Sequence, residues 1–294
     1  MTLDEIEAIN AETRRTIAAA GGNLALLAEA SLPYYGYVEV DFPECPRIVM
    51  FTNNDAPGIS SAMRGAFEPH SMKVWARLCR GATGILDIGA NVGIYSLCAA
   101  RVRPDLTVHA YEPNPYAYAR LRVHKVINAL DNIVEHQVAI GPEDGMAGFG
   151  WVVKPGGNIA SGGGFSHYHK GVRKERLLVQ VVNLDRSGIA PTLGARPLVK
   201  IDVEGAEGIV IDAMKETIGL RPDMILETFN KETCDALNAQ FLPLGYRVYR
   251  IREKAGALDL ADGLVAADMN DPLADFNHLL TTRPASEIET LMRA

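Results

Sequence analysis

The chain has few cysteines, and none of them lies at the spacing of a metal or redox motif. Four occur in 294 residues, with no C-x-x-C pair among them: Cys45, Cys79, Cys98 and Cys234. Cys98 falls in the apolar pattern of a predicted helix, where a thiol behaves as a small hydrophobic side chain. We therefore expect reduced and mostly buried thiols.

Long apolar runs and an excess of positive charge are also missing. No apolar stretch approaches the length of a membrane span. The N-terminus, Met-Thr-Leu-Asp-Glu-Ile-Glu, lacks the basic and then apolar layout of a secretory signal. A formal net charge of −7 disfavours broad binding to a phosphate backbone, which draws on clustered Lys and Arg. These absences predict a cytoplasmic protein with no membrane span and no nucleic-acid partner.

The most informative segment that is present is Ile85-Leu-Asp-Ile-Gly-Ala-Asn-Val-Gly-Ile-Tyr95. Its apolar residues predict a parallel strand that is buried on both faces. Gly89 and Gly93 allow a backbone turn that a Cβ would block. The pattern indicates the first strand, turn and helix of a nucleotide-binding α/β domain. Glu112 ends the next apolar run, where a carboxylate is placed to accept the hydroxyls of a ribose.

A third glycine is missing from this turn. Dinucleotide enzymes use G-x-G-x-x-G to bring a pyrophosphate against the backbone, whereas this chain reads G-A-N-V-G. Asp87 lies beside the turn, and no cation is placed to offset a pyrophosphate. An acid suits a cofactor with an ammonium group, such as S-adenosylmethionine. The alternatives are that Asp87 only caps the turn and that the chain is a nicotinamide-dependent oxidoreductase.

Strands and helices alternate from residue 84 to residue 251, which predicts a mostly parallel sheet with helices on both faces. The predicted strands are 84–88, 106–111, 133–138, 197–203, 222–227 and 245–251, and the predicted helices are 92–102, 115–129, 206–215 and 231–240. An antiparallel strand from Asn277 to Thr281 completes an expected seven-stranded sheet.

Residues 1–67 predict an N-terminal extension of helices and a β-hairpin. Apolar residues at helical spacing over residues 3–31 are divided into two helices by Gly21-Gly22. Their apolar stripe needs a partner surface, which is either the chain's own sheet or a second copy in a homodimer. Two hairpin strands, a loop and a further helix are expected at Tyr37 to Phe42, Arg47 to Phe51, Thr52 to Gly65 and Glu68 to Arg80.

Three sequence blocks occur in order: Leu86-Asp-Ile-Gly-Ala-Asn-Val-Gly-Ile-Tyr-Ser96, Tyr111-Glu-Pro-Asn-Pro115 and Val199-Lys-Ile-Asp-Val-Glu-Gly-Ala-Glu207. Together they resemble the FkbM-type S-adenosylmethionine-dependent methyltransferases. The resemblance implies a Rossmann-like class I methyltransferase domain over residues 68–294 and S-adenosylmethionine as cofactor. It also implies O-methylation of a small molecule or sugar, in natural-product or glycan modification. An N-methyltransferase and a non-catalytic cofactor-binding protein remain alternatives.

The predicted cofactor contacts follow these blocks. The methionine portion is expected to contact Gly89, Ala90 and Gly93, and its polar groups to be held by Asp87 and Asn91. The adenosine is expected to contact Glu112 through the ribose, Val138 and Ala139 through the adenine, and Pro113 and Asn114 along its length. Asp144 is an alternative contact of the adenine. Glu68 resembles the family's acid before the first motif and is expected at the amino-acid end of the cofactor, with helix capping as its alternative.

Lys200, Asp202 and Glu204 alternate along a predicted strand, so their side chains project from one face near the C-terminal edge of the sheet. Buried charges are costly without partners, which favours a functional role over a Lys200–Asp202 ion pair that only fixes the strand end. Removing the proton of an alcohol requires a base within hydrogen-bond reach. Asp202 is the first candidate for this base, with Glu204 and Glu227 as further polar wall. Glu207 is expected to cap a helix start.

The alternation breaks in an insertion at about residues 145–195. Two strands, Gly148 to Val153 and Arg176 to Val182, flank a glycine-rich loop from Lys154 to His169. Such a loop beside the ligand edge of a sheet is the usual position of a mobile lid, although a surface linker is the alternative. The loop carries the second-choice bases His167 and His169 and the candidate substrate contacts Asn158 and Tyr168. Without a third ligand at recognisable spacing, the histidine pair predicts no metal site.

Overall fold

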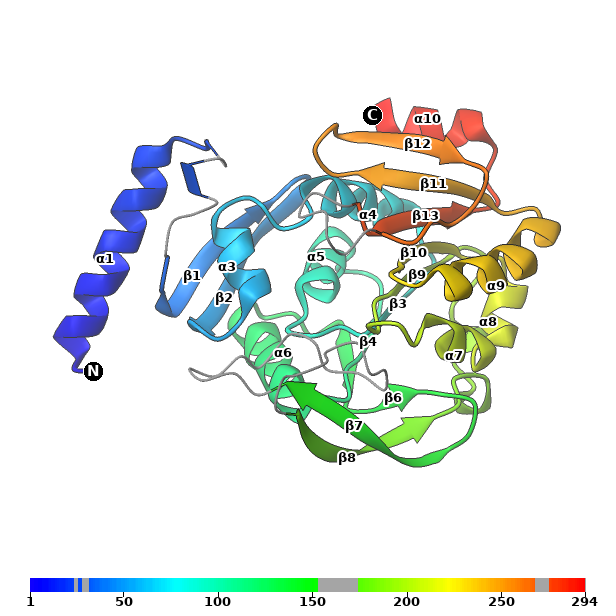
Figure 1. Ribbon diagram of the computed structural model, residues 1–294, viewed down its shortest axis with the longest axis horizontal. Coiled ribbons are helices and arrows are strands. Elements are labelled where there is room, and N and C mark those ends of the chain that lie inside the picture. Colours follow the sequence, from blue (N-terminus) through cyan, green and yellow to red (C-terminus); the bar gives the residue numbers. More distant parts are fainter. Residues whose placement is uncertain (24–25, 28–31, 153–173, 268–274, 294) are drawn as a thin grey trace.

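The core of the protein is a twisted eight-stranded sheet with the strand order β12-β11-β13-β10-β9-β3-β4-β5 (Figure 1). The computed structural model describes residues 1–23, 26–27, 32–152, 174–267 and 275–293. Five neighbouring strands are parallel: β5 (Ile133–His136), β4 (Val108–Tyr111), β3 (Gly84–Ile88), β9 (Pro197–Ile201) and β10 (Asp223–Glu227). Every residue of β3 and β9 is buried, as expected for strands covered on both faces.

The other edge of the sheet is antiparallel. Strand β13 (Asn277–Thr281) pairs antiparallel with β10 and with β11 (Arg247–Arg252), which confirms the predicted final strand. The expectation of seven strands is wrong by one, because β12 (Ala257–Ala261) adds an outer antiparallel strand. None of its five residues is buried, so its sequence lacks the apolar run that marked the other strands.

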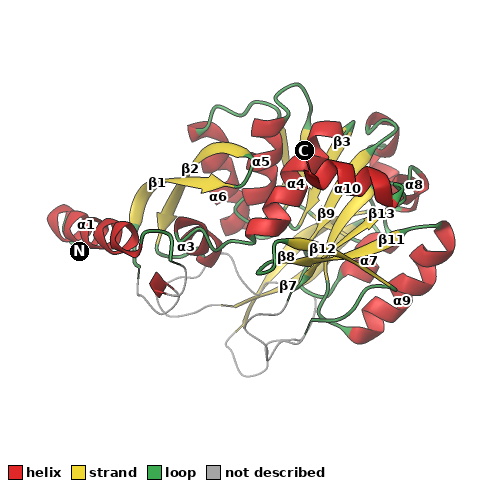
Figure 2. Cartoon of the chain, turned by 90° about the horizontal axis from the view of Figure 1, so that it is seen from above, coloured by secondary structure: helices red, strands yellow, loops and turns green. Residues whose placement is uncertain are grey.

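Helices cover both faces of this sheet (Figure 2). One face carries α4 (Pro69–Gly81), α5 (Ile94–Val102), α6 (Pro115–Ile127) and α10 (Ala285–Arg293), and the other carries α7 (Glu207–Asp212), α8 (Lys215–Gly219) and α9 (Lys231–Phe241). The single helix predicted over 206–215 is therefore two short helices. Short 3-10 turns occupy Asp185–Ser187, Ala190–Thr192 and Leu242–Leu244. Mostly parallel strands between two helical layers confirm the predicted Rossmann-like α/β class.

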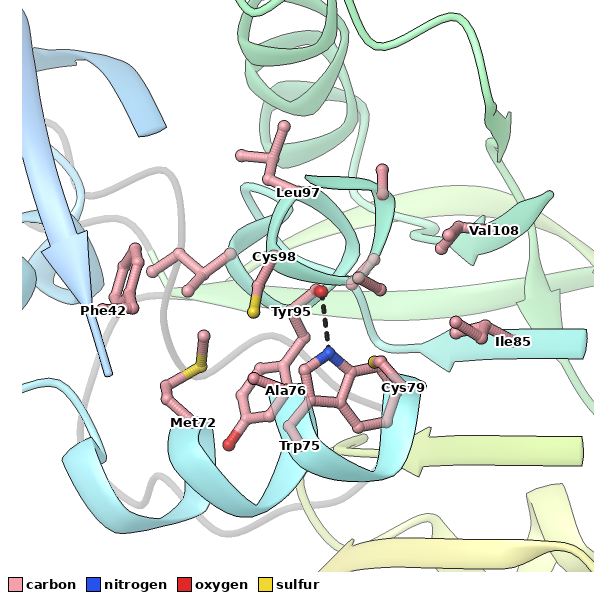
Figure 3. Packing of buried hydrophobic residues seen from close by; sticks show 14 of the residues in the cluster. Phe42, Met72, Trp75, Ala76, Cys79, Ile85, Tyr95, Leu97, Cys98 and Val108 are labelled. Atoms are coloured by element: carbon pink, nitrogen blue, oxygen red, sulfur yellow. Dashed lines mark hydrogen bonds between the residues drawn. The ribbon is translucent and has the colours of Figure 1, made fainter. Parts of the chain in front are cut away.

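Helix α4 packs against α5 through buried side chains, among them the aromatic pair Trp75 and Tyr95 (Figure 3). The indole Nε1 of Trp75 donates a 3.0 Å hydrogen bond to the carbonyl oxygen of Tyr95, and the two rings meet edge to face at 5.4 Å between centroids. Both side chains are almost fully buried, among residues such as Met72 and Cys98. The ring of Tyr95 is thereby held in place, with its hydroxyl available to the polar groups at the strand ends.

The N-terminal extension is a helix and a hairpin. Helix α1 (Leu3–Ala20) ends at Gly21 in the left-handed conformation, as predicted, and it lies outside β1 (Tyr35–Phe42) and β2 (Cys45–Asn53) (Figure 1). The second predicted helix of this region lies partly outside the described residues. The loop predicted from Thr52 to Gly65 contains a short helix, α3 (Pro57–Met63), which begins at a proline and buries Ile59.

Two strands of the insertion, β7 (Gly145–Val152) and β8 (Lys174–Val182), form a separate three-stranded sheet with β6 (Ala139–Ile140), which precedes the insertion. This confirms the two predicted strands and shows that the chain leaves the main sheet after β5. The candidate residues Asn158, His167, Tyr168 and His169 lie outside the described residues, so their roles stay predictions.

The structure bears on two expectations from the composition, those for the cysteines and for membrane-spanning segments. Cys79, Cys98 and Cys234 are buried, Cys45 is half-buried, and all four thiols are free, as predicted. None of the helices in the described part of the chain combines the length and the apolar composition that a bilayer-crossing segment needs.

Candidate functional site

A cavity of about 250 Å³ opens at the C-terminal ends of the parallel strands. Its walls come from the segments that follow β3, β4, β5, β9 and β10, together with Glu68 and with Phe149 of β7. This is the place where open α/β sheets bind ligands. A smaller cavity of about 90 Å³ adjoins it and shares Glu68, Gly89, Asn91 and Asp202 with its lining.

The structure brings most of the predicted residues to these two cavities. The larger one is lined by Glu68, Gly89, Asn91, Glu112, Pro113, Asn114, Val138, Ala139, Asp202, Glu204 and Glu227. The smaller one adds Asp87, Ala90 and Lys200. Asp144, the alternative contact of the adenine, lies on a different cavity and accepts a hydrogen bond from the main chain of Asn183.

The turn after β3 uses its own main-chain donors internally. The amides of Gly89 and Ala90 both donate to the carbonyl of Tyr111, at 2.9 and 3.0 Å. The amide of Asn91 donates to Glu112 Oε2 at 2.8 Å. A pyrophosphate site presents free N–H groups to its ligand, and these three are already occupied. The turn is therefore unsuited to a dinucleotide.

The two glycines of this turn serve close packing. Gly89 has a φ of +84°, and a Cβ there would lie 1.8 Å from the carbonyl oxygen of Asp202. Gly93 has a φ of +93°, and a Cβ would lie 3.0 Å from Leu121 Cγ. Gly93 was expected along the cofactor, but it faces Leu121 of α6. Gly89 lies against the segment that follows β9. The protein itself therefore excludes a side chain at Gly89, whereas at Gly93 a side chain would meet a strained backbone and require Leu121 to shift.

Glu112 is held by the main chain on both sides. Its Oε2 accepts the amide of Asn91 and its Oε1 accepts the amide of Asn114, each at 2.8 Å. Burial raises the pKa of this carboxyl to about 7, although the two amides oppose the change. Each carboxylate oxygen retains a second lone pair. A fixed, buried carboxylate at the cavity wall is thus able to accept two hydroxyl groups of a ligand.

Asp87 lies within β3 and does not cap the turn. Its Oδ2 accepts a 2.5 Å hydrogen bond from the Ser96 hydroxyl on α5. Burial raises the pKa of Asp87 to about 6, and the Ser96 hydroxyl and the charge of Lys200 counter part of this effect. Asp87 therefore adds negative potential to the smaller cavity from beneath the turn.

The side of the site opposite Glu112 is centred on Lys200, whose side chain is 1% exposed. Its Nζ lies 3.4 Å from Asp202 Oδ2, 3.3 Å from Asn277 Oδ1 and 5.1 Å from the centre of the Tyr95 ring. Burial lowers the pKa of this amine, but the surrounding carboxylates, Asp202 first, outweigh it and raise the pKa. Lys200 is therefore a fixed positive charge among acids.

Glu68 completes this network, although it stands just before α4. Its side chain makes no capping bond with that helix. Instead, Oε2 accepts the Tyr95 hydroxyl at 2.5 Å and the Asn277 amide at 2.8 Å. Burial raises the pKa of Glu68, against the opposing charge of Lys200. Tyr95 and Asn277 were not predicted to take part, because only the folded chain brings α5 and β13 to this point.

The predicted alternation of Lys200, Asp202 and Glu204 fails after the second residue. Strand β9 ends at Ile201, and Glu204 has a φ of +53°, so the chain turns before Glu204 can follow the strand face. Glu204 still lines the larger cavity. Glu207 begins α7 and accepts the amide of Gly205 at 2.9 Å, which agrees with its predicted place at a helix start.

Carboxylates are numerous at this site, yet they do not form a metal centre. Among the residues that the structure describes, no group of three or more His, Cys, Asp or Glu side chains is arranged to hold a metal ion. The ammonium of Lys200 lies beside Asp202, and Tyr95 and Asn277 donate hydrogen bonds to Glu68, so these acids are stabilised by protein groups and not by a metal ion.

Comparison with known proteins gives this arrangement a family. The model of the methyltransferase FkbM domain matches residues 87–248, which is more than half of the chain. Methyltransferase 1 of Beauveria bassiana is 25% identical over 145 residues, 45% of this chain and 58% of that protein. The 31-O-demethyl-FK506 methyltransferase FkbM of Streptomyces tacrolimicus is 39% identical over 62 residues, 21% of this chain and 24% of that protein.

A solved structure of methyltransferase FkbM from Methylobacillus flagellatus aligns with a TM-score of 0.41 and 17% identity, over 68% of this chain and 43% of that one. The chain thus spans less than two thirds of the length of each of these relatives.

The lining of the cavities fits a cationic nucleoside cofactor. Glu112 offers a fixed acceptor for ribose hydroxyls, Val138 and Ala139 offer apolar surface to a base, and Asp87 and Glu68 lie where an ammonium group gains from negative charge. The amides of Gly89, Ala90 and Asn91 already bond within the protein and are not free to bind a pyrophosphate, which argues against the dinucleotide alternative. With the FkbM domain matched over residues 87–248, the chain belongs to the FkbM methyltransferase family, whose cofactor is S-adenosylmethionine.

Proposed function

We propose that the chain transfers a methyl group from S-adenosylmethionine to a hydroxyl oxygen of a small molecule or sugar. The observation that carries this proposal is Asp202, a partly exposed carboxylate on the wall shared by both cavities, 3.4 Å from the buried ammonium of Lys200. The name of the Streptomyces relative, 31-O-demethyl-FK506 methyltransferase, refers to methylation of an oxygen and supports this proposal.

The cofactor supplies an activated methyl group on a positively charged sulfur, so the protein has to orient the acceptor and remove its proton. Glu112, Pro113, Asn114, Val138 and Ala139 hold the adenosine. Asp87, Gly89, Ala90, Asn91 and Glu68 surround the methionine portion. Asp202 takes the proton of the acceptor hydroxyl, and Glu204 and Glu227 form the polar wall beside it.

The ionisation of Asp202 suits a base. Burial raises the pKa of this carboxyl, but the charge of Lys200 and the hydrogen bonds of Glu227 and Lys200 outweigh burial and lower the pKa. Asp202 is therefore in its proton-accepting form at neutral pH. A neutral amine acceptor already carries a free lone pair, so an N-methyltransferase would have less need of this group.

The test is Asp202→Asn, assayed for release of S-adenosylhomocysteine with panels of alcohols, sugars and amines, and for cofactor binding by calorimetry. Turnover with the hydroxyl acceptor is expected to fall by roughly 10²- to 10⁴-fold, while the cofactor Kd changes much less. Asp212→Asn, an exposed aspartate at the end of α7, is the matched control and should behave as the unaltered chain. Equal turnover in Asp202→Asn would remove Asp202 as the base, and turnover with amines alone would make the chain an N-methyltransferase.

A further inference from the structure

Asp202 and Glu227 stand side by side at the ends of neighbouring parallel strands. In the register of β9 and β10, Ile225 pairs with Lys200 and Leu226 with Ile201. The residues that follow are Asp202, directly after β9, and Glu227, the last residue of β10. Neighbouring strands of a sheet lie about 4.8 Å apart, so the register sets the two carboxyl groups beside each other, and each shifts the pKa of the other, Asp202 downward and Glu227 upward. Both line the larger cavity.

A hydrogen bond between two carboxyl groups requires that one of them carries a proton. Two neighbouring carboxylates on the wall of one cavity repel each other, so ionising both carries an electrostatic penalty. The pair therefore divides one proton between an acid and a base, as coupled carboxyl groups do.

The position of Lys200 decides which member is ionised. Its ammonium lies 3.4 Å from Asp202 Oδ2, and Asp202 is the charge that acts on it most strongly. Burial, followed by the charge of Asp202 and the hydrogen bond to it, raises the pKa of Glu227 well above its usual value. Other titratable groups that face the pair reinforce this order: Glu68 repels a charge on Glu227, and Tyr95 holds Glu68 through its hydroxyl.

The ammonium that sets this order is itself held rigidly. Lys200 is fixed by the oxygen of Asn277 and by the face of the Tyr95 ring, and Asn277 is in turn bonded to Glu68. A mobile lysine would alternate between the two acids. This lysine is confined to the Asp202 side, so the proton stays on Glu227.

We propose that Asp202 and Glu227 act as a carboxyl dyad, in which ionised Asp202 is the base and protonated Glu227 is the positioning residue that donates to it. This role rests on the proposed O-methyl transfer. The acceptor oxygen gains the methyl group and loses its proton to Asp202, while the electron pair of the broken carbon–sulfur bond remains on sulfur. The dyad then holds two protons and returns one to solvent before the next turnover.

The protonation state is tested on the unliganded protein by infrared difference spectroscopy at pH 7, comparing the unaltered chain with Glu227→Gln. Loss of a protonated carboxyl band is expected. Glu232→Gln, at an exposed position in the first turn of α9, is the control and should lose a carboxylate band instead. A carboxylate loss in Glu227→Gln would overturn the dyad, and this readout does not depend on any acceptor.

Kinetics test the positioning role separately. Glu227→Gln retains a neutral N–H donor for Asp202 and should keep at least about tenfold more turnover than Glu227→Ala, which removes the donor. Both variants should bind S-adenosylmethionine alike, so the difference appears in kcat. If Gln and Ala are equally impaired, the donor has no part in catalysis. If the chain shows no O-methyl transfer while the protonated band is present, the proposed function fails and the dyad's ionisation stands.

Discussion

The two ends of the larger cavity, the proposed cofactor end at Glu112 and the proposed acceptor end at Asp202, hold their carboxylates in different ways. At the cofactor end, Glu112 is fixed by two main-chain amides, from Asn91 and Asn114. At the acceptor end, Asp202 is held by a side chain, that of Lys200, whose Nζ lies 3.4 Å from its Oδ2. Main-chain donors are available whatever the residue type, whereas a side-chain network depends on the identity of each member. We therefore expect substitutions of the residues that hold Glu112 to cost less than substitutions of the residue that holds Asp202.

Both ends meet at Gly89, where the largest effect is expected. Gly89→Ala would place a Cβ 1.8 Å from the Asp202 carbonyl oxygen at a φ of +84°. The overlap forces the turn and the segment after β9 apart, which should cost about 3 kcal/mol or more of unfolding free energy and remove cofactor binding. Chemical denaturation and calorimetry measure these two quantities.

Gly65→Ala is the matched control for this change. Gly65 has a φ of +69°, but a Cβ added there would meet no atom within 4 Å beyond its chain neighbours. Alanine at this position therefore adds only the strain of the left-handed backbone, about 1–2 kcal/mol. Similar losses in both variants would show that backbone strain alone explains Gly89, and that its contact with Asp202 is unimportant.

The same contrast explains what the sequence could predict. The strand, turn and helix around Gly89 and the acid at Glu112 lie within short segments, and a main-chain amide of the turn bonds to Glu112. Spacing alone was therefore enough to predict that they lie together, while their contacts with a cofactor stay a prediction. The mostly parallel sheet with helices on both faces followed from the alternation of strands and helices, whereas the order of the strands did not. Outer strand β12 escaped prediction because a half-exposed edge strand has no apolar run to mark it.

The acceptor end could be predicted only in part. Lys200, Asp202 and Glu204 were identified as costly charges near a strand end, but the contacts that hold Lys200 and Glu68 in place come from Tyr95 and Asn277. Those two residues come from α5 and β13, 182 residues apart by their numbers (277 − 95). A network of side chains that are so distant in sequence leaves no spacing pattern. The left-handed turn at Glu204 likewise broke an alternation that the sequence continued.

An intermediate effect is expected from Glu112→Gln. An amide offers one acceptor oxygen where two main-chain amides, Asn91 and Asn114, need partners. Affinity for S-adenosylmethionine should fall by roughly 10- to 100-fold, the loss of hydrogen bonds to a charged group. Calorimetry measures the affinity, and Glu143→Gln, at an exposed position, should leave it unchanged.

The pH dependence of cofactor affinity sharpens this prediction. Burial raises the pKa of Glu112 to about 7 in the folded chain from an ordinary value of 4.5. The protonated form therefore stabilises the fold, and this contribution is lost as pH rises through 7. A cationic cofactor with hydroxyl donors prefers the ionised carboxylate, so affinity should rise from about pH 6.5 to about pH 8. The same rise in Glu112→Gln would assign the titration to another group.

The smallest effect concerns Asn114, which belongs to the cofactor end through both its main chain and its side chain. Its amide N–H bonds to Glu112, and its Oδ1 caps α6 by accepting the amide of Tyr116 at 3.0 Å. Asn114→Ala keeps the first bond and loses the cap, so stability should fall by about 1 kcal/mol.

Asn230 separates capping from binding, because it caps α9 in the same way and does not line the cavity. Asn230→Ala should lose a similar ~1 kcal/mol in chemical denaturation and leave the cofactor Kd unchanged. Asn114→Ala should in addition weaken the cofactor by roughly three- to tenfold, the worth of one neutral hydrogen bond. A loss as large as that of Glu112→Gln would mean that side chains, and not main-chain amides, hold the cofactor end. The contrast between the two ends of the cavity would then disappear.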